Sequence, residues 1–328
     1  MTIEKNIPLA PLTTFRLGGA ARYFVRVKNI DELREAFEIS KSRNLEILLL
    51  GGGSNLLIDD AGFGGLVIKI EITGVEQDGA RLIAGAGESW DALVKRAVEE
   101  NLWGLENLSG IPGTVGAAPV QNIGAYGAEL KDTLEWLEAL DTTNGEVSRF
   151  INNECGFGYR TSLFKKNPGR HVILRAAFNL KKDGKPNDSY KDLVDISRLN
   201  LGEIRAKVLA IRAQKFPDLA QEGTAGSFFL NPVVTPQVAA ALAQRYPDLP
   251  QFEVEGGIKL SLAWLLDNAL NLKGASIGGA RLFERQPLVI AASPEARAGD
   301  VYALAQKIKK EVREKLGIEI EEEVRILC

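Results

Sequence analysis

The stretch Ile47-Leu-Leu-Leu-Gly-Gly-Gly-Ser-Asn-Leu-Leu-Ile58 decides how the first part of this chain folds. Ile47–Leu50 is an apolar run that predicts a short buried strand, and Leu56–Ile58 predicts another strand directly after the loop. The glycines at 51–53 leave main-chain N–H groups unshielded, so the loop can bind an anion such as a pyrophosphate. A tight turn between two strands explains the same residues, and both interpretations stay open at this point.

Two common nucleotide-binding loops do not fit this stretch. A Walker loop needs Gly-Lys-Ser or Gly-Lys-Thr, and the dinucleotide fingerprint of doubly wound folds needs a helix directly after its glycines.

Around the loop, Tyr23–Val27 predicts a strand and Asp31–Arg43 predicts a helix with one apolar face. A second cycle follows, in which the strand Arg81–Ala84 precedes a helix capped by Ser89. The first third of the chain therefore alternates strands and helices.

Length and composition limit the class of protein. The chain has 328 residues, more than one ordinary compact core holds, and 45% of them are hydrophobic and 25% charged, as in folded globular proteins. Forty basic and 43 acidic side chains give a net charge of −3, so we expect no nucleic-acid partner. We expect neither a secretory signal nor a membrane span, because the N-terminus is polar and no apolar run approaches the roughly 18 residues of a spanning helix.

Histidine and cysteine usage narrows the chemistry. His171 is the one histidine, so multi-histidine metal sites are impossible and we expect no metal. It lies in a strand-like run ending at Phe178, where a structural or surface role is the simpler interpretation. Cys155 and Cys328 could form at most one bridge, which favours a reduced, cytoplasmic setting.

The C-terminal half carries clear start and stop signals for helices. Glu203–Lys215 predicts a helix stopped by Pro217, and Thr235 before Pro236 predicts the start of a helix that runs to Arg245. A last helix is expected over residues 298–316, ended by a glycine at 317. A strand is then expected from residue 318 to residue 327, with alternate residues on opposite faces.

Four further segments could carry chemistry, although each has a structural alternative. Leu105–Gly127 is rich in Gly, Ala, Pro and Asn with little charge, as in a buried loop close to a planar ligand. Cys155–Ser162 places an arginine, which can offer a fork to a carboxylate or phosphate, beside an aromatic ring. Gly223–Pro232 places a serine beside two phenylalanines, and Glu319–Arg325 carries a row of glutamates. The structural alternatives are a glycine-rich loop, a surface Tyr-Arg pair, a turn before a strand and a solvated face.

Taken in order, these segments resemble the UDP-N-acetylenolpyruvoylglucosamine reductases, the flavoenzymes of peptidoglycan precursor synthesis. The resemblance runs from Thr13 to the C-terminus, and Asp188–Leu193 resembles the tyrosine loop of the type I branch. The matching motifs are Gly51-Gly-Gly-Ser-Asn55, Ile111-Pro-Gly-Thr-Val-Gly-Ala117, Asn122-Ile-Gly-Ala-Tyr-Gly127, Gly158-Tyr-Arg-Thr-Ser162 and Ala225-Gly-Ser-Phe-Phe229.

The resemblance implies an α+β fold, in which a two-lobed FAD-binding domain of the PCMH/vanillyl-alcohol-oxidase type is joined by a smaller α+β substrate-binding domain. The expected ranges are 1–200 for the FAD-binding domain, with lobes of about 1–55 and 56–200, and 201–317 for the substrate-binding domain. A C-terminal strand over 318–328 is expected to return to the active site. FAD is expected to be held non-covalently, by Gly51, Gly52, Gly53, Ser54, Asn55, Ile111, Pro112, Gly113, Gly116, Ala117 and Asn122.

The implied activity is an NADPH-dependent oxidoreductase, a UDP-N-acetylmuramate dehydrogenase, which serves cell-wall biogenesis and thereby cell shape and division. NADPH reduces FAD, and hydride then passes to the vinyl end of the enolpyruvyl group of UDP-N-acetylglucosamine enolpyruvate. By resemblance Arg160 clamps the substrate carboxylate, Glu323 orients it, and Ser227 donates the proton to the adjacent carbon.

The resemblance also implies a set of substrate contacts and shows departures from the family pattern. The expected contacts are Tyr159, Tyr190, Lys215, Asn231, Lys259, Lys273 and Gln286. Leu230, Phe252 and Phe283 stand where family members often have lysine, tyrosine and histidine, which affects diphosphate or NADPH binding rather than the chemistry. The chain is expected to act as a monomer. Another FAD-dependent oxidoreductase on the same scaffold, or a non-catalytic flavin or nucleotide-sugar binding protein, remains an alternative.

Overall fold

The computed structural model describes residues 1–327, and the chain divides into two compact units. The first unit comprises residues 1–7, 21–53 and 64–212, and the second comprises residues 8–20, 54–63 and those from Ala213 onward. Two N-terminal segments thus belong to the second unit. The first unit also continues past the expected boundary at residue 200, because helix α4 (Leu201–Lys215) packs Ile204 and Val208 against Leu193 in a small apolar cluster.

The strand that precedes the glycine loop, β3, belongs to a four-stranded sheet. Its order is β1-β2-β5-β3, and β3 and β5 run parallel, with Leu50 opposite Lys69. Helix α1 (Ile30–Ser42) begins at Asn29, whose side chain accepts the Glu32 N–H at 2.9 Å. The predicted strands and helix here are confirmed. The strands are β1 (Glu4–Pro8), β2 (Ala20–Val27), β3 (Ile47–Leu50) and β5 (Phe63–Ile70).

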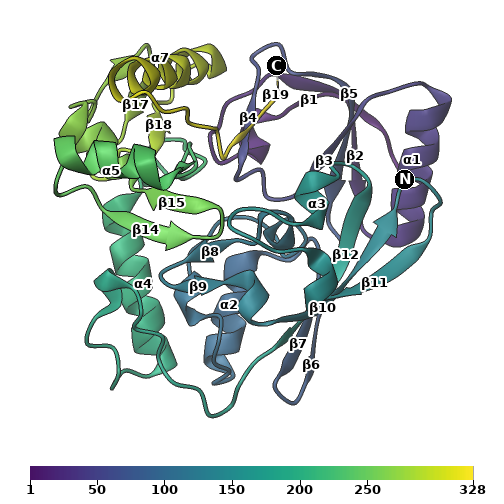
Figure 1. Cartoon of the computed structure of the whole chain (residues 1–328). Coiled ribbons are helices and arrows are strands. Elements are labelled where there is room, and N and C mark those ends of the chain that lie inside the picture. The colour runs from purple at the N-terminus through teal and green to yellow at the C-terminus, as the bar shows by residue number, and fades with distance from the viewer. Residues whose placement is uncertain (328) are drawn as a thin grey trace. The chain divides into compact units, whose positions relative to one another are not determined.

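A five-stranded antiparallel sheet, β11-β10-β12-β7-β6, forms the other half of the first unit (Figure 1). Helix α2 (Trp90–Glu99) shares its apolar core and is capped by Ser89, as predicted. His171 on β12 packs edge-on against the rings of Phe150 and Phe164, with Nε2 3.6 Å from an Asp141 oxygen. Its surroundings are those of a packed structural residue. The strands are β6 (Val75–Asp78), β7 (Arg81–Gly85), β10 (Leu134–Asp141), β11 (Val147–Ile151) and β12 (His171–Asn179).

The glycine-rich connection from residue 104 to residue 132 is irregular and largely buried, as its composition predicts. Its regular pieces are short: η2 (Glu106–Leu108), η3 (Ala118–Gln121), η4 (Leu130–Asp132), β8 (Gly124–Ala125) and β9 (Ala128–Glu129). Glu106 is buried, and burial raises the pKa of its carboxyl despite the N–H of Gly104 at 2.7 Å. The connection is therefore a packed part of the protein rather than a solvated linker.

A bidentate ion pair ties α4 to α2. Both Nη atoms of Arg205 lie 2.7 Å from oxygens of Asp91, which also accepts the Gly110 N–H at 2.5 Å. Burial would raise the pKa of Asp91, but the hydrogen bonds from Arg205 and Gly110 outweigh it and lower this pKa. A depressed pKa means that Asp91 stabilises the fold above its unfolded pKa, and that this contribution disappears as the pH falls through the folded value.

We expect Asp91→Ala to lower the free energy of unfolding by about 1.5 kcal/mol at pH 7, a value discounted because Asp91 is partly exposed. The difference from the wild type should vanish in acid, below the lowered pKa of Asp91. Urea unfolding of both proteins, at pH 7 and in acid, measures this difference in unfolding free energy. Asp78→Ala is the matched control, because Asp78 is exposed and only approaches Arg81 at 3.5 Å, so its loss should change stability by less than about 0.5 kcal/mol. An equal loss for the two variants would contradict the anchoring role of Asp91.

In its described residues the second unit contains two small sheets, the α-helices α5, α6 and α7, and a parallel strand pair. The sheets are ordered β13-β15-β14 and β16-β17-β18, and α7 packs against β16 and β17 (Figure 1). As predicted, Thr235 caps the start of α5, and Gly317 ends α7 with a left-handed backbone, φ +67°. The elements are α5 (Pro236–Arg245), α6 (Leu262–Trp264), α7 (Ala298–Leu316), β4 (Leu56–Ile58), β13 (Val233–Val234), β14 (Gln251–Val254), β15 (Gly257–Leu260), β16 (Ser276–Ile277), β17 (Ala280–Leu282), β18 (Ile290–Ala292) and β19 (Arg325–Leu327).

The predicted continuous strand over residues 318–327 is wrong for most of its length. Only β19 is a regular strand, paired in parallel with β4, while residues 318–324 are irregular. The side chains of Ile318, Ile320 and Val324 are still buried in the core of the second unit, so burial follows the pattern although ladder pairing does not. Cys155 is buried, which raises its pKa to about 12, and Cys328 lies outside the described residues.

Candidate functional site

Two glycine-rich loops of the first unit approach each other so closely that a side chain at Gly51 or Gly52 would clash. A Cβ atom at Gly51 would lie 2.7 Å from Thr114 Oγ1, and one at Gly52 would lie 2.5 Å from Gly113 Cα. Gly53 has φ +62°, in the left-handed region that favours glycine. Within residues 1–327, neither Gly52 nor Gly53 donates its N–H to another main-chain group. The loop thus has the glycine composition, and at Gly53 the left-handed backbone, that main-chain nests for anions use.

Hydrogen bonds link the loop that carries Asn122 to the loop that carries Arg160 in the same unit. Asn122 is fully buried with φ +45°, and its Nδ2 donates to Glu129 at 3.0 Å and to the Gly158 carbonyl at 3.3 Å. Arg160 also has a left-handed backbone, with φ +53°, and its Nη2 donates to the Gly124 carbonyl at 3.0 Å. The structure therefore brings these two predicted site residues together through the Gly124 and Gly158 loops.

The two tyrosines expected to contact the substrate also belong to the first unit. Tyr159 directly precedes Arg160 and is 39% exposed, with the guanidinium 5.8 Å from its ring centre. Tyr190 packs edge-on against Tyr126 at 5.4 Å between ring centres. Asn107 holds the loop that leads to Tyr190, because its Nδ2 donates to the carbonyls of Tyr126 and Asn187 at 2.8 and 2.9 Å.

The segments that carry Ser227 and Glu323, far apart in sequence, pair in the second unit. The N–H of Glu323 donates to the Phe228 carbonyl at 2.8 Å, and the Leu230 N–H donates to the Glu321 carbonyl at 2.9 Å. Ser227 itself forms an antiparallel bridge with Val289. Main-chain hydrogen bonds thus hold the segment that carries the serine beside the segment that carries the glutamates.

The neighbouring glutamates have different surroundings from Glu323. Glu322 accepts two hydrogen bonds from Lys309 Nζ, each 2.9 Å long, and Glu321 is exposed. Asn55 lies next to Glu323, because its Nδ2 donates to the Glu323 carbonyl at 3.0 Å and its own carbonyl accepts the Arg325 N–H at 3.1 Å. Glu323 is therefore the glutamate of this row whose main-chain carbonyl accepts a hydrogen bond from Asn55.

The remaining predicted substrate contacts are spread over the second unit. On β15, Lys259 lies between Val233 of β13 and Phe252 of β14, with its ammonium 5.6 Å from the phenylalanine ring centre. Lys273 Nζ lies 3.6 Å from Asp267. The others are Lys215 at the end of α4, Asn231, whose Oδ1 accepts the Leu262 N–H at 3.0 Å, and Gln286 in the turn before Val289.

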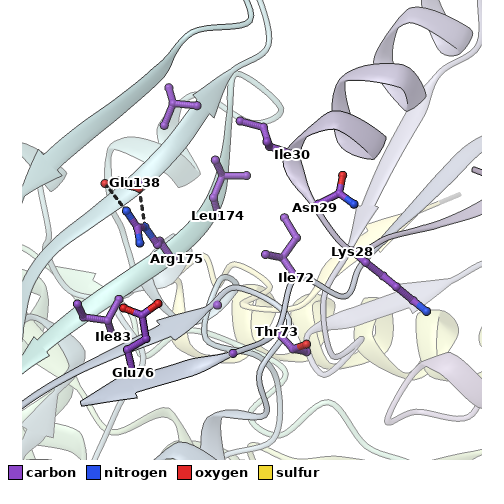
Figure 2. Close-up of a pocket in the computed structure, with 13 residues that line it drawn as sticks. Lys28, Asn29, Ile30, Ile72, Thr73, Glu76, Ile83, Glu138, Leu174 and Arg175 are labelled. Atoms are coloured by element: carbon purple, nitrogen blue, oxygen red, sulfur yellow. Dashed lines mark hydrogen bonds and ion pairs between the residues drawn. The ribbon is translucent and has the colours of Figure 1, made fainter. Parts of the chain in front are cut away.

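A cavity of about 410 Å³ lies elsewhere in the first unit (Figure 2). It is bordered by the start of α1 and by strands of the five-stranded sheet, and the Arg175–Glu138 ion pair lies on its wall at 2.6 Å. Its described lining includes none of the predicted site residues. Among residues 1–327 no group of three or more His, Cys, Asp or Glu side chains is placed to hold a metal ion, and no helix combines the length and apolarity needed to cross a membrane.

Comparisons with known proteins identify the family. Residues 21–150 match the model of an FAD binding domain, and residues 218–327 match that of the UDP-N-acetylenolpyruvoylglucosamine reductase C-terminal domain. The chain is 39% identical to the UDP-N-acetylenolpyruvoylglucosamine reductase of Photobacterium profundum, over 100% of this chain and 96% of that one. The chain belongs to the UDP-N-acetylenolpyruvoylglucosamine reductase family. The reductase of Neisseria gonorrhoeae is 43% identical over 98% of this chain and 96% of its own length.

The fold of this family member agrees with a solved relative. The crystal structure of the enzyme from Thermus caldophilus matches with a TM-score of 0.74 and 27% identity, over 100% of both chains. The predicted fold class, an FAD-binding domain of mixed α and β structure joined to a smaller α+β domain, is confirmed. The assignment to the type I branch stays a prediction.

The first unit of this reductase-family chain fits FAD. Gly52 lies against Gly113, and within residues 1–327 neither Gly52 nor Gly53 donates its N–H to another main-chain group, so these N–H groups could serve a diphosphate. The loop from Leu105 to Gly127 is rich in small residues and amides. These features fit the expected cofactor.

Sequence reasoning missed Lys69 on β5. Its ammonium donates a hydrogen bond to the carbonyl oxygen of Gly51. The signal was present, because a lysine interrupts an otherwise apolar run from Leu66 to Ile70 on a strand that pairs with β3. Only the register of that pair reveals that the lysine faces the glycine loop.

Proposed function

We propose that this chain reduces the enolpyruvyl group of UDP-N-acetylglucosamine enolpyruvate to UDP-N-acetylmuramate, with NADPH as hydride donor and FAD as cofactor, in peptidoglycan precursor synthesis. Family membership gives the reaction. The observation that supports the proposal for this chain is the main-chain pairing between the segment that carries Ser227 and the segment that carries Glu323. Protonation next to a substrate carboxylate requires a proton donor and a group that orients the carboxylate, and we propose that these two segments supply them.

FAD, when bound, accepts hydride from NADPH and supplies it to the double bond. We assign its diphosphate to the main-chain N–H groups of Gly52, which lies against Gly113 of the second glycine-rich loop, and of Gly53, which has a left-handed backbone. The other cofactor contacts proposed are Gly51, Ser54, Asn55, Ile111, Pro112, Gly113, Gly116, Ala117 and Asn122. The side chain of Asn122 is engaged with Glu129 and Gly158, so it supports the loop that meets Arg160.

Ser227 is the proposed acid. A hydroxyl is a weak acid in water, but it suffices when the acceptor is a strongly basic carbon in a dry site. Phe228 and Phe229, which follow it, are each 1% exposed and form part of the core around it. Glu323 is proposed to orient the substrate carboxylate, since Glu322 is already paired with Lys309.

Arg160 is proposed to clamp the substrate carboxylate. Its planar guanidinium can form two parallel hydrogen bonds with a carboxylate, and a charge-assisted pair of this kind stabilises the negative charge that builds up in the transition state. The hydrogen bond to the Gly124 carbonyl and the left-handed backbone at Arg160 fix the direction of its side chain. We assign the substrate's remaining groups to Tyr159, Tyr190, Lys215, Asn231, Lys259, Lys273 and Gln286.

The first unit is proposed as the FAD-binding domain and most of the second as the substrate-binding domain, with the segment after residue 317 returning to the site. We further propose that the protein acts in the cytoplasm as a monomer. Its substrates are small molecules, and neither nucleic acid nor membrane is needed for the reaction.

Turnover of the purified protein tests the function. We expect a yellow protein whose oxidised-flavin absorbance bands survive gel filtration and are released on denaturation, and which oxidises NADPH when UDP-N-acetylglucosamine enolpyruvate is added. NADPH oxidation only with other acceptors would favour a different flavin oxidoreductase. Flavin binding without NADPH oxidation would favour a non-catalytic binding protein.

A further inference from the structure

Lys69 occupies an unusual position for a lysine. It lies on β5 within the run Leu66–Ile70, opposite Leu50 of β3, and its ammonium donates to the carbonyl oxygen of Gly51. Burial lowers its pKa, with smaller contributions from Glu71, which raises it, and Arg26, which lowers it. Keeping a lysine in such a place costs free energy, so a compensating role is expected.

The charge of Lys69 is not neutralised by a neighbouring carboxylate. Glu71, the acidic group beside it, accepts a 2.6 Å hydrogen bond from Arg26. In the part of the chain that the structure describes, no carboxylate oxygen lies within 4 Å of Lys69 Nζ. Among the described residues, this ammonium therefore donates to the Gly51 carbonyl and forms no ion pair with a carboxylate.

The contact also fixes a peptide plane. In a planar trans peptide the C=O and the following N–H point in opposite directions. Because Lys69 holds the Gly51 carbonyl, the N–H of Gly52 must point away from β5, and the Cα of Gly52 lies against Gly113. Rotation of this peptide would break the lysine contact.

We propose that Lys69 is a positioning residue for the cofactor: it fixes and polarises the Gly51–Gly52 peptide so that the Gly52 N–H is presented to the diphosphate of the dinucleotide. The inference rests on the proposed FAD function. The ammonium does not touch the cofactor; it acts through the peptide and through its positive charge, which favours the two negative charges of a diphosphate.

The test compares two flavins on the full-length protein. Holoenzyme is stripped of flavin and titrated with FAD and, separately, with riboflavin, which lacks both phosphates. The variants are Lys69→Met, which removes donor and charge, and Lys69→Arg, which restores both. Lys95→Met is the matched control, since Lys95 is an exposed lysine of the same unit, 3.6 Å from Glu99. Thermal melting of each flavin-free protein shows whether the variant is folded.

We expect Lys69→Met to raise the Kd for FAD about tenfold and the Kd for riboflavin less than about twofold. Lys69→Arg and Lys95→Met should stay near the wild type, and FAD should raise the Tm of Lys69→Met less than that of the wild type. An unchanged FAD Kd in Lys69→Met would overturn the proposal, as would equal losses for both flavins or a flavin-free Lys69→Met that is unfolded. A wild type that binds no FAD would instead overturn the proposed function itself.

Discussion

Ser227→Ala should lower the rate of UDP-N-acetylmuramate formation by about 10³-fold, because a positioned proton donor contributes about that much to a rate. Reduction of the flavin by NADPH should change less than about twofold, since no substrate carbon is protonated in that half-reaction. Stopped-flow absorbance of the flavin separates the two steps: bleaching after mixing with NADPH, and recovery after mixing with the enolpyruvyl sugar nucleotide. The variant should therefore bleach normally and recover slowly.

Ser293→Ala is the control for this experiment. Ser293 is also a serine of the second unit, but its hydroxyl donates to Glu295 at 3.0 Å on the exposed surface. Both half-reactions should match the wild type in this variant. If the recovery step of Ser227→Ala were as fast as that of Ser293→Ala, then Ser227 would not be the acid.

Gly52→Ala should release the cofactor and weaken the fold together. The new Cβ would lie 2.5 Å from Gly113 Cα, which is main chain and has no room to move without separating the two loops. Overpacking of this kind costs about 1–3 kcal/mol of unfolding free energy. Loss of two charge-assisted hydrogen bonds to the diphosphate, at about 1.5 kcal/mol each, corresponds to roughly a hundredfold weaker FAD binding.

Gly64→Ala provides the matched comparison in the same unit. Gly64 lies on β5, and a Cβ there would meet nothing within 4 Å. This variant should remain yellow, with the Tm and FAD Kd of the wild type. A colourless Gly64→Ala, or a Gly52→Ala that keeps its flavin through gel filtration, would show that the glycine loop does not carry the diphosphate.

The sequence predicted the local elements well where interactions between residues close in sequence determine them. Helix α5 begins at Thr235 because a threonine side chain satisfies an N–H of the first turn, here that of Val238 at 3.4 Å. Helix α7 ends at Gly317 because the left-handed backbone there is accessible to glycine. Leu56–Ile58 is a strand, as its apolar run predicts. The glycines are therefore followed by a strand and not by the helix that a dinucleotide fingerprint needs.

Prediction failed where a segment pairs with distant parts of the chain. Residues 318–324 alternate as a strand would, yet the Glu323 N–H donates to the Phe228 carbonyl and the Glu321 carbonyl accepts the Leu230 N–H, instead of forming a regular ladder. A period-two pattern reports which side chains are buried, and it does not report which main-chain groups are available as partners.

From the sequence alone, the order of the elements, the glycine loops and the candidate residues Arg160, Ser227 and Glu323 could be identified. The tertiary structure alone decided that the segment carrying Ser227 pairs with the segment carrying Glu323, that Gly52 abuts Gly113, and that Lys69 holds the Gly51 carbonyl. The reason is physical: local conformation depends on sterics and hydrogen bonds within a few residues, whereas these contacts join groups far apart in sequence, and only the packing of the folded core determines which of them meet.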